Sequence, residues 1–147
     1  VGVDLGATKV LASVVNLSNG KIVSTSKKKT RAGTEGFDLV QRLSLVIGDA
    51  LQESGMSTDK ISGIGIGAAG MVDRERGVLL AAANIGTNDV PICEPLKNQF
   101  GLPVKLGNDV EVATIGEMTF GAGRNCSNFV CIFVGTGIGS GIVHGGK

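Results

Sequence analysis

The start of the chain carries short apolar segments separated by turn residues. Residues 1–5, 10–17 and 21–29 each alternate or run apolar, which is the pattern of strands with a buried face. Ser18-Asn19-Gly20 lies between the second and third segments, and both Asn and Gly tolerate the positive φ that a hairpin turn needs. The pattern therefore predicts three consecutive antiparallel strands.

The next segment has the period of a helix. Its apolar side chains recur three and four residues apart and share one face over about five turns; they are Leu39, Leu43, Val46, Ile47, Ala50 and Leu51. Thr34 is placed to cap the first turn, and Gly55 is placed to end the helix. We expect one amphipathic helix here.

The rest of the chain alternates strand-like and helix-like segments. The predicted strands are residues 61–69, a pair around the turn at 74–77, residues 103–106, and a glycine-bent hairpin at 129–143. The predicted helices are residues 91–99 and 110–120. A strand meander followed by alternating strands and helices is typical of an α/β fold with a mixed sheet.

Length and composition are those of a folded soluble protein. The chain has 147 residues, of which 42% are hydrophobic and 18% charged, with a formal net charge of +1. This balance excludes a disordered tail and a nucleic-acid coat protein, and the length suits one domain with part of another. The basic run at Lys27–Lys29 and Arg31 has no interleaved aromatic residue, so we interpret it as a solvated face and not a nucleic-acid site.

The sequence predicts neither a membrane span nor a disulfide framework. The longest apolar runs, at residues 61–69 and 129–134, are far shorter than the roughly 20 residues that cross a bilayer, and no signal peptide is visible. Cys93, Cys126 and Cys131 are odd in number and lack Cys-x-x-Cys spacing, which argues against disulfide or zinc frameworks. Buried reduced thiols in a cytoplasmic protein are the simpler interpretation.

Two glycine loops carry the strongest chemical signal. In GVDLGATKV, residues 2–10, a strand ends at Asp4 and is followed by Gly6 and Thr8, which leaves backbone N–H groups and a hydroxyl to face an anion. A carboxylate beside an anion site makes sense when Mg²⁺ lies between them, usually through water. FVGTGIGSGIV, residues 133–143, repeats the arrangement. A plain hairpin turn with a solvated Asp4 is the alternative.

Neither loop matches a common nucleotide-binding motif. The first lacks the Gly-Lys-Ser/Thr of a Walker loop. The second loosely matches Gly-x-Gly-x-x-Gly, but no helix pattern follows it. A Rossmann dinucleotide site is therefore not predicted.

A polar pair, Asn108-Asp109, lies where an apolar strand meets a helix in LGNDVEVATIGE, residues 106–117. Either side chain suits a helix N-cap, because it can accept from the free N–H groups of the first turn. Ligands also bind at the carboxyl ends of strands in α/β sheets. Asp109 could therefore accept the proton of a substrate hydroxyl, with Asn108 bonded to a neighbouring hydroxyl. The two roles are compatible, and both stay open.

Four motifs occur in the order and spacing of a known family. DLGATK, GIGAAGMVD, LGNDVEVATIGEMTFGAG and VGTGIGSGIVHGGK resemble those of the ROK family, the sugar kinases and sugar-responsive repressors of the actin/hexokinase/Hsp70 superfamily. The resemblance implies an actin-like ATPase (ribonuclease H-like) domain. Residues 1–120 would be an N-terminal lobe with the sugar cleft and the first phosphate loop, and residues 121–147 the start of a truncated second, nucleotide lobe.

The resemblance also implies roles for individual residues. The ATP phosphates would be held between the two loops, by Gly6, Thr8 and Lys9 on one side and by Gly135, Thr136 and Gly137 on the other. Asp4 would lie near Mg²⁺ and Asp109 would be the catalytic base. The sugar would contact Gly70, Asn84, Asn108 and Asp109. Zinc would bind only through residues beyond this chain.

The implied function is ATP-dependent phosphorylation of a hexose or N-acetylhexosamine hydroxyl, as in a glucokinase, by a cytoplasmic homo-oligomer, a dimer or a tetramer. The alternative is the sugar-sensing domain of a ROK-type repressor, with a helix-turn-helix ahead of residue 1. A sensor needs neither a base nor a phosphate loop, so Asp109 and DLGATK favour the kinase. An actin- or Hsp70-like ATPase has no support from residues 106–117. No nucleic-acid or membrane partner is expected for this segment.

Overall fold

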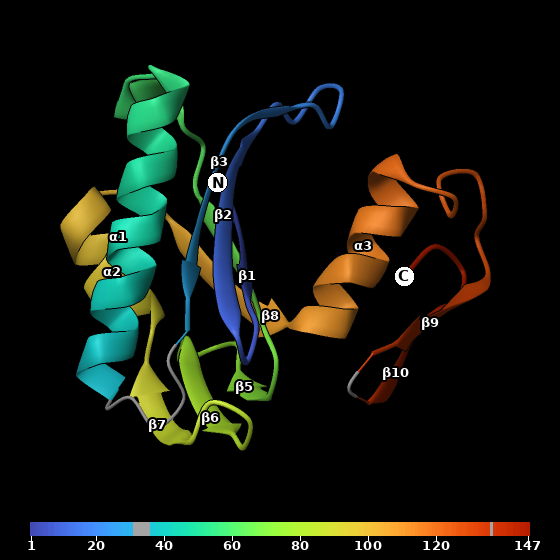
Figure 1. The fold of residues 1–147 in the computed structure, drawn as a ribbon. Coiled ribbons are helices and arrows are strands. Elements are labelled where there is room, and N and C mark those ends of the chain that lie inside the picture. The colour runs from blue at the N-terminus through green and yellow to red at the C-terminus, as the bar shows by residue number, and fades with distance from the viewer. Residues whose placement is uncertain (31–35, 136) are drawn as a thin grey trace.

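The computed structural model describes residues 1–30, 36–135 and 137–147, and its centre is a five-stranded sheet (Figure 1). In sheet order the strands are β3 (Ile22–Lys29), β2 (Lys9–Val15), β1 (Gly2–Leu5), β4 (Ile64–Ala68) and β8 (Val104–Asn108). β1, β2 and β3 form an antiparallel meander, whereas β1, β4 and β8 run parallel. The predicted mixed sheet and its three-strand meander are confirmed.

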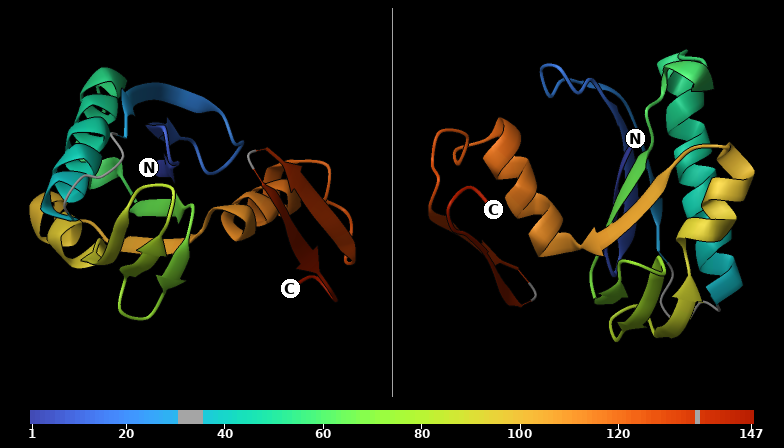
Figure 2. Two further views of the ribbon diagram at one scale, coloured as in Figure 1. Left: turned by 60° about the horizontal axis from the view of Figure 1, so that its bottom comes forward. Right: turned by 180° about the vertical axis from the view of Figure 1, so that it is seen from behind.

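One face of this sheet carries the hydrophobic core. Val3 and Leu5 of β1 are buried, whereas Gly2 and Asp4, which alternate with them, are exposed, as the two-residue period of a strand requires. Helices α1 (Gly36–Ser54) and α2 (Cys93–Phe100) cover the buried face (Figures 1 and 2). The apolar face predicted for α1 is confirmed, because its members are fully buried: Leu39, Leu43, Val46, Ile47 and Ala50.

The end of α1 follows the prediction. Gly55 has a φ of +64°, a conformation that glycine adopts at little cost, and its N–H donates to the Gln52 carbonyl at 3.1 Å. Thr34, the predicted cap at the other end, lies outside the described residues. A short 3-10 helix (Thr58–Lys60) then leads to β4. None of the helices in the described parts is long and apolar enough to span a membrane.

A second, antiparallel sheet lies beside one end of the first (Figure 1). Its strands are β5 (Met71–Asp73), β6 (Val78–Ala82) and β7 (Thr87–Pro91), in that order. The strand pair predicted around residues 74–77 is confirmed, but β7 was not predicted. Pro91 ends this edge strand, where a missing N–H is tolerated, so α2 begins at Cys93 and not at residue 91.

Helix α3 (Asp109–Phe120) and the hairpin of β9 (Phe129–Val134) and β10 (Ile138–Val143) lie on the other side of the main sheet (Figures 1 and 2). The predicted glycine-bent hairpin is confirmed, and two of its glycines let β10 approach α3. A Cβ on Gly139 would lie 2.8 Å from Val110 Cγ2, and a Cβ on Gly141 would overlap the Thr114 side chain. A lobe boundary after residue 120 stays a prediction.

Candidate active site

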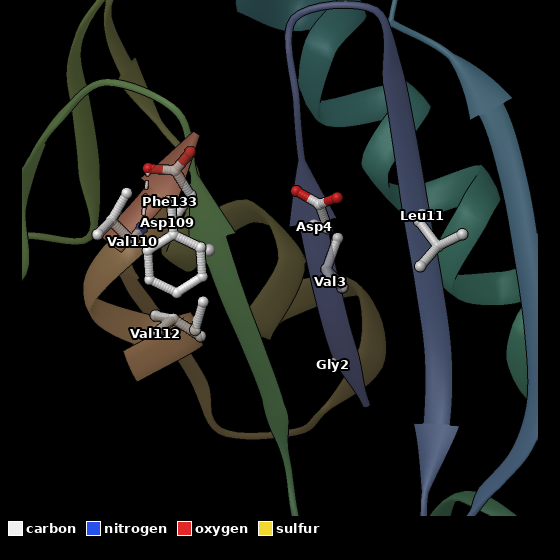
Figure 3. A pocket seen from close by; sticks show the side chains of 10 residues that line it. Gly2, Val3, Asp4, Leu11, Asp109, Val110, Val112 and Phe133 are labelled. Atoms are coloured by element: carbon white, nitrogen blue, oxygen red, sulfur yellow. Dashed lines mark hydrogen bonds between the residues drawn. The ribbon is translucent and has the colours of Figure 1, made fainter. Parts of the chain in front are cut away.

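A cavity of about 390 Å³ lies between the open face of the main sheet and the α3 side of the molecule (Figure 3). The sheet contributes Asp4, Leu11 and Gly67 to its lining, and Asp109 and Phe133 line it from α3 and β9. Along each strand, side chains alternate between the face that α1 covers and the open face. Asp4, Leu11 and Gly67 lie on the open face, and the residues next to them in the chain lie on the covered one. Groups from both ends of the sequence therefore share one cavity.

The carboxylates of Asp4 and Asp109 lie at the same end of this cavity (Figure 3). Loss of hydration raises the pKa of Asp4; the Lys9 ammonium opposes the rise, and the Asp109 carboxylate adds to it. A hard cation such as Mg²⁺ usually binds to one or two carboxylates, with substrate phosphates and water as its other ligands. The described residues hold no cluster of three or more metal-ligating side chains, and the role of Asp4 beside such a cation stays a prediction.

The first glycine loop forms the tight hairpin between β1 and β2. The Gly6 N–H donates to the Lys9 carbonyl at 3.0 Å, and a Cβ on Gly6 would lie 3.2 Å from that oxygen. Any larger residue would therefore crowd the turn. The side chains of Thr8 and Lys9 are exposed, so the hydroxyl and the ammonium are accessible to an anion. Their contact with phosphate remains a prediction.

Thr30, which no sequence pattern singled out, holds this hairpin from the end of β3. Its hydroxyl donates to the Gly6 carbonyl at 2.7 Å, and its N–H donates to the Thr8 carbonyl at 2.9 Å. Its side chain is fully buried. The only signal in the sequence is an uncharged residue directly after three lysines, and that signal does not identify a partner.

Asn108 caps α3 and ties it to the turn between β4 and β5. Its Oδ1 accepts from the N–H groups of Val110 and Glu111, at 3.0 and 3.4 Å, and its Nδ2 donates to the Gly70 carbonyl at 3.1 Å. The predicted N-cap is confirmed. Since both oxygen lone pairs are used, one amide N–H is left for the predicted sugar contact.

Asp109 is held at the cavity because two glycines let α3 begin close to the sheet. A Cβ on Gly107 would lie 2.8 Å from Val112 Cγ2, and a Cβ on Gly67 would lie 3.4 Å from the Asp109 Cα. The Asp109 Oδ1 accepts from the Val110 N–H at 3.0 Å, which restrains the carboxylate. The position of Asp109 thus depends on small residues in β4 and β8.

The other two predicted sugar contacts are Gly70 and Asn84. Gly70 is bonded to Asn108, whereas Asn84 lies away from Asn108 and Asp109. A Cβ on Gly70 would overlap the Ala81 carbonyl oxygen, so the turn after β4 needs glycine to pack on β6. Asn84 is exposed in the turn between β6 and β7 and is not among the residues that line the cavity. Its contact with sugar stays a prediction.

The second glycine loop is the exposed tip of the hairpin between β9 and β10. The Gly135 N–H donates to the Gly137 carbonyl at 2.9 Å, and Thr136 lies outside the described residues. A Cβ on either glycine would meet no heavy atom within 4 Å. Packing in the described structure therefore does not require glycine at these positions, whereas close approach of a ligand would.

Comparison with known proteins finds sugar kinases and a putative repressor that are similar to this chain. The chain matches the model of the ROK family over residues 1–147. The glucokinase of Streptomyces coelicolor is 38% identical over 147 residues, which are 100% of this chain and 44% of that protein. The putative xylose repressor of Caldicellulosiruptor sp. is 31% identical over 145 residues, 99% of this chain and 36% of that protein.

A solved structure agrees with the sequence comparison. The ROK family glucokinase from Streptomyces griseus, crystallised in complex with glucose and AMPPNP, superposes with a TM-score of 0.85 at 37% identity, over 99% of this chain and 44% of that chain. The chain thus spans less than half the length of these relatives. Over that span the predicted fold, the α/β lobe of actin-like sugar kinases, is confirmed. Because the family model covers every residue, from the first glycine hairpin to the second, the chain belongs to the ROK family.

Proposed function

We propose that the protein carrying this chain transfers the γ-phosphoryl group of ATP to a hydroxyl of a hexose or an N-acetylhexosamine, as a glucokinase-type enzyme. The observation that carries the proposal is the pair of carboxylates, Asp4 from β1 and Asp109 from α3, in one cavity beside the first glycine hairpin. A kinase needs one group near the metal and another near the attacking hydroxyl. The similarity to a glucokinase solved with glucose and AMPPNP supports both ligands.

In this proposal Asp109 is the general base. The sugar oxygen forms a bond to the γ-phosphorus while the bond to the bridging oxygen of ADP breaks, and the hydroxyl proton passes to the Asp109 carboxylate. The remaining amide N–H of Asn108 would donate to a neighbouring sugar hydroxyl. Gly70 and Asn84 would line the sugar side of the cleft.

The phosphate side of the cleft would be built from the two hairpins. Asp4 would hold Mg²⁺, which when bound neutralises phosphate charge. The Thr8 hydroxyl and the Lys9 ammonium would bind phosphate oxygens, and Gly6 would allow their close approach. The second hairpin, with Gly135, Thr136 and Gly137, would face them.

Cellular setting and assembly belong to the same proposal. We expect the enzyme to act in the cytoplasm as a homo-oligomer, a dimer or a tetramer. Light scattering on the purified protein at several concentrations tests the assembly, and a monomer at every concentration contradicts it.

Sugar sensing in a transcriptional repressor is the second candidate function. The 31% identity to a putative xylose repressor over 99% of this chain favours it. A kinase converts sugar and ATP into sugar phosphate and ADP, whereas a sensor binds sugar without turnover. ATP-dependent phosphorylation measured with a panel of hexoses and N-acetylhexosamines separates the two, and sugar binding with no turnover would favour the sensor.

Asp109→Asn in the protein that carries this chain tests the assigned base. Asn keeps the shape of Asp and an oxygen that accepts from the Val110 N–H, but it cannot take a proton. General bases contribute about 10²–10⁴-fold, so we expect kcat to fall about a thousandfold with sugar affinity kept within about tenfold. Steady-state kinetics and sugar titration measure both.

Glu111→Gln is the matched control for this experiment. Glu111 lies in the same helical turn, is exposed, and forms an ion pair with Arg74. Exposed pairs contribute about 0–1 kcal/mol, so kcat should stay within about threefold. If Asp109 only capped α3, Asp109→Asn would change kcat by less than about tenfold and mainly lower the melting temperature.

A further inference from the structure

The turn between β2 and β3 reaches across to the far end of α3 (Figures 1 and 2). A Cβ on Gly20 in this turn would lie 3.0 Å from Cδ1 and 3.1 Å from Cγ of Phe120, the last residue of α3. Gly20 has a φ of +71°, which glycine adopts at little cost. The Phe120 ring therefore lies against backbone that carries no side chain, and 47% of this residue stays exposed.

Hydrogen bonds within the turn fix its conformation. The Gly20 N–H donates to the Asn16 carbonyl at 2.8 Å, and the Asn16 N–H donates to the Lys21 carbonyl at 2.9 Å. The Oδ1 atoms of Asn16 and Asn19 accept from the N–H groups of Ser18 and Lys21, both at 2.9 Å. Since the asparagines are exposed, these bonds and not burial hold the turn in shape. A turn held in this way can resist displacement of the ring.

The opposite end of α3 is fixed to the main sheet. Asn108 caps its first turn, and the close approach at Gly67 and Gly107 packs that turn on β4 and β8. α3 has 12 residues, a length of about 18 Å, so a tilt of about 10° about its start would move its last residue by about 3 Å. The second hairpin packs on α3 through Gly139 and Gly141 and would move with it.

We propose that Phe120 is a positioning residue: its contact with Gly20, here called the brace, fixes the tilt of α3 and with it the separation of the two glycine hairpins. The brace rests on the proposed function, in which the ATP phosphates lie between those hairpins and the sugar binds near Asn108, at the fixed end of α3. A change of tilt would alter the nucleotide side more than the sugar side. Loss of the brace should therefore raise KM for ATP and leave KM for sugar nearly constant.

Phe120→Ala in the protein that carries this chain removes the ring and tests the brace by steady-state kinetics. We expect KM for ATP to rise about threefold to tenfold, as for other couplings through packed elements, with KM for sugar nearly unchanged. Phe120→Leu keeps an apolar side chain against the turn and should keep KM for ATP close to that of the unchanged protein. Ile115→Ala is the matched control, because Ile115 lies on the same helix, is 55% exposed, and leaves the brace intact when truncated.

Gly20→Ala completes a double-mutant cycle. Its methyl group would crowd the ring, and Ala disfavours this φ, so this substitution alone should also raise KM for ATP. In a protein that already carries Phe120→Ala it should raise KM for ATP no further, because the effects of contacting residues are not additive whereas those of independent residues are. Additive effects of the two substitutions overturn the brace. An equal rise of both KM values in Phe120→Ala, or an equal effect of Ile115→Ala, also overturns it.

Amide hydrogen exchange measures the brace without turnover. Phe120→Ala should speed exchange in the turn at residues 16–21 and in the second half of α3, whereas the capped start of α3 should exchange as slowly as before. Unchanged exchange in the turn and in α3 overturns the brace. Failure of the proposed function has a different signature, namely no sugar phosphorylation with ATP by the unchanged protein, and exchange alone then decides whether the contact fixes α3. Melting curves of each variant establish that the fold is retained.

Discussion

At the scale of single residues, a few hydrogen bonds determine how the candidate site is built. Asn108 uses three bonds to hold the start of α3 against the turn at Gly70. Thr30 uses its hydroxyl and its N–H to hold the first hairpin at Gly6 and Thr8. These bonds join protein groups to one another, yet they position the groups that would bind ligand. We therefore expect a substitution of Thr30 to act on ligand affinity through the geometry of the hairpin.

Thr30→Val removes the hydroxyl and keeps the shape of the side chain. The Gly6 carbonyl then loses its donor, which costs about 1 kcal/mol of stability and loosens the hairpin. In the protein that carries this chain we expect KM for ATP to rise several-fold while KM for sugar stays nearly constant. Thr30→Ser keeps the hydroxyl and should restore KM for ATP. Equal changes in both KM values would contradict a role specific to the phosphate hairpin.

Asp4→Asn tests the electrostatics of the cavity. Partial loss of hydration raises the pKa of Asp4 in the fold, the Lys9 ammonium opposes the rise, and the Asp109 carboxylate adds to it, so ionised Asp4 is disfavoured there. This cost is present above the folded-state pKa and vanishes as the pH falls below the ordinary value. Without nucleotide, Asp4→Asn should therefore raise the melting temperature near neutral pH, and the gain should shrink as the medium is acidified. A lower melting temperature at neutral pH would mean that the attraction of Lys9 outweighs both effects.

At the scale of elements, glycines in one short motif are required for different physical reasons. In the hairpin of β9 and β10, a Cβ on Gly141 would overlap Thr114 of α3, whereas a Cβ on Gly137 would meet nothing within 4 Å. Gly141 is thus explained by helix packing. Gly137 has no packing reason among the described residues, so a ligand requirement is the hypothesis that remains.

Gly137→Val and Gly141→Val form a discriminating pair in the protein that carries this chain. Gly141→Val forces β10 away from α3 and should destabilise the fold by about 1–3 kcal/mol, as overpacking does. Gly137→Val should leave the melting temperature nearly unchanged but weaken ATP binding at least about tenfold by blocking backbone approach, with sugar affinity kept. Unchanged ATP affinity in a folded Gly137→Val protein would make this loop an ordinary hairpin.

At the scale of the whole molecule, one face of the hairpin formed by β9 and β10 is left uncovered by the described residues. The outer face of the hairpin is apolar except for Ser140, which lies opposite Ile132. Its apolar residues are Val130, Ile132, Val134, Ile138 and Ile142. Their exposed fractions run from 57% to 81%. The inner face packs on α3 through Gly139 and Gly141. Contiguous apolar faces of this kind mark surfaces that another segment or chain covers.

A polypeptide of residues 1–147 should therefore bind an environment-sensitive dye and self-associate as its concentration rises. Ile132→Lys should reduce both effects, because it places a charge in the middle of the face. Leu17→Lys is the control, since Leu17 and Ile132 are equally exposed at 68%, but Leu17 lies in the turn after β2. Equal effects of the two substitutions would show that no particular face drives association. Dye fluorescence and light scattering measure the outcome.

Local patterns predicted most of the elements because they depend on near neighbours in the chain. The strand alternation of residues 1–29, the apolar stripe of α1, Gly55 at its end and the cap at Asn108 all follow from spacing and from local hydrogen bonds. The strand β7 was missed, because its register with β6 depends on tertiary pairing and Pro91 resembles a helix start.

The sequence by itself determined the fold class, the family motifs and the candidacy of Asp4 and Asp109, because chemical type and order along the chain carry that information. Only the tertiary structure decided which residues meet. It brought Asp4 and Asp109 into one cavity, put Thr30 under the first hairpin, and separated Lys28 from Lys27 and Lys29 across the sheet. These relations depend on strand order and on helix-to-sheet packing, which join residues far apart in the chain and leave no periodic signal within it.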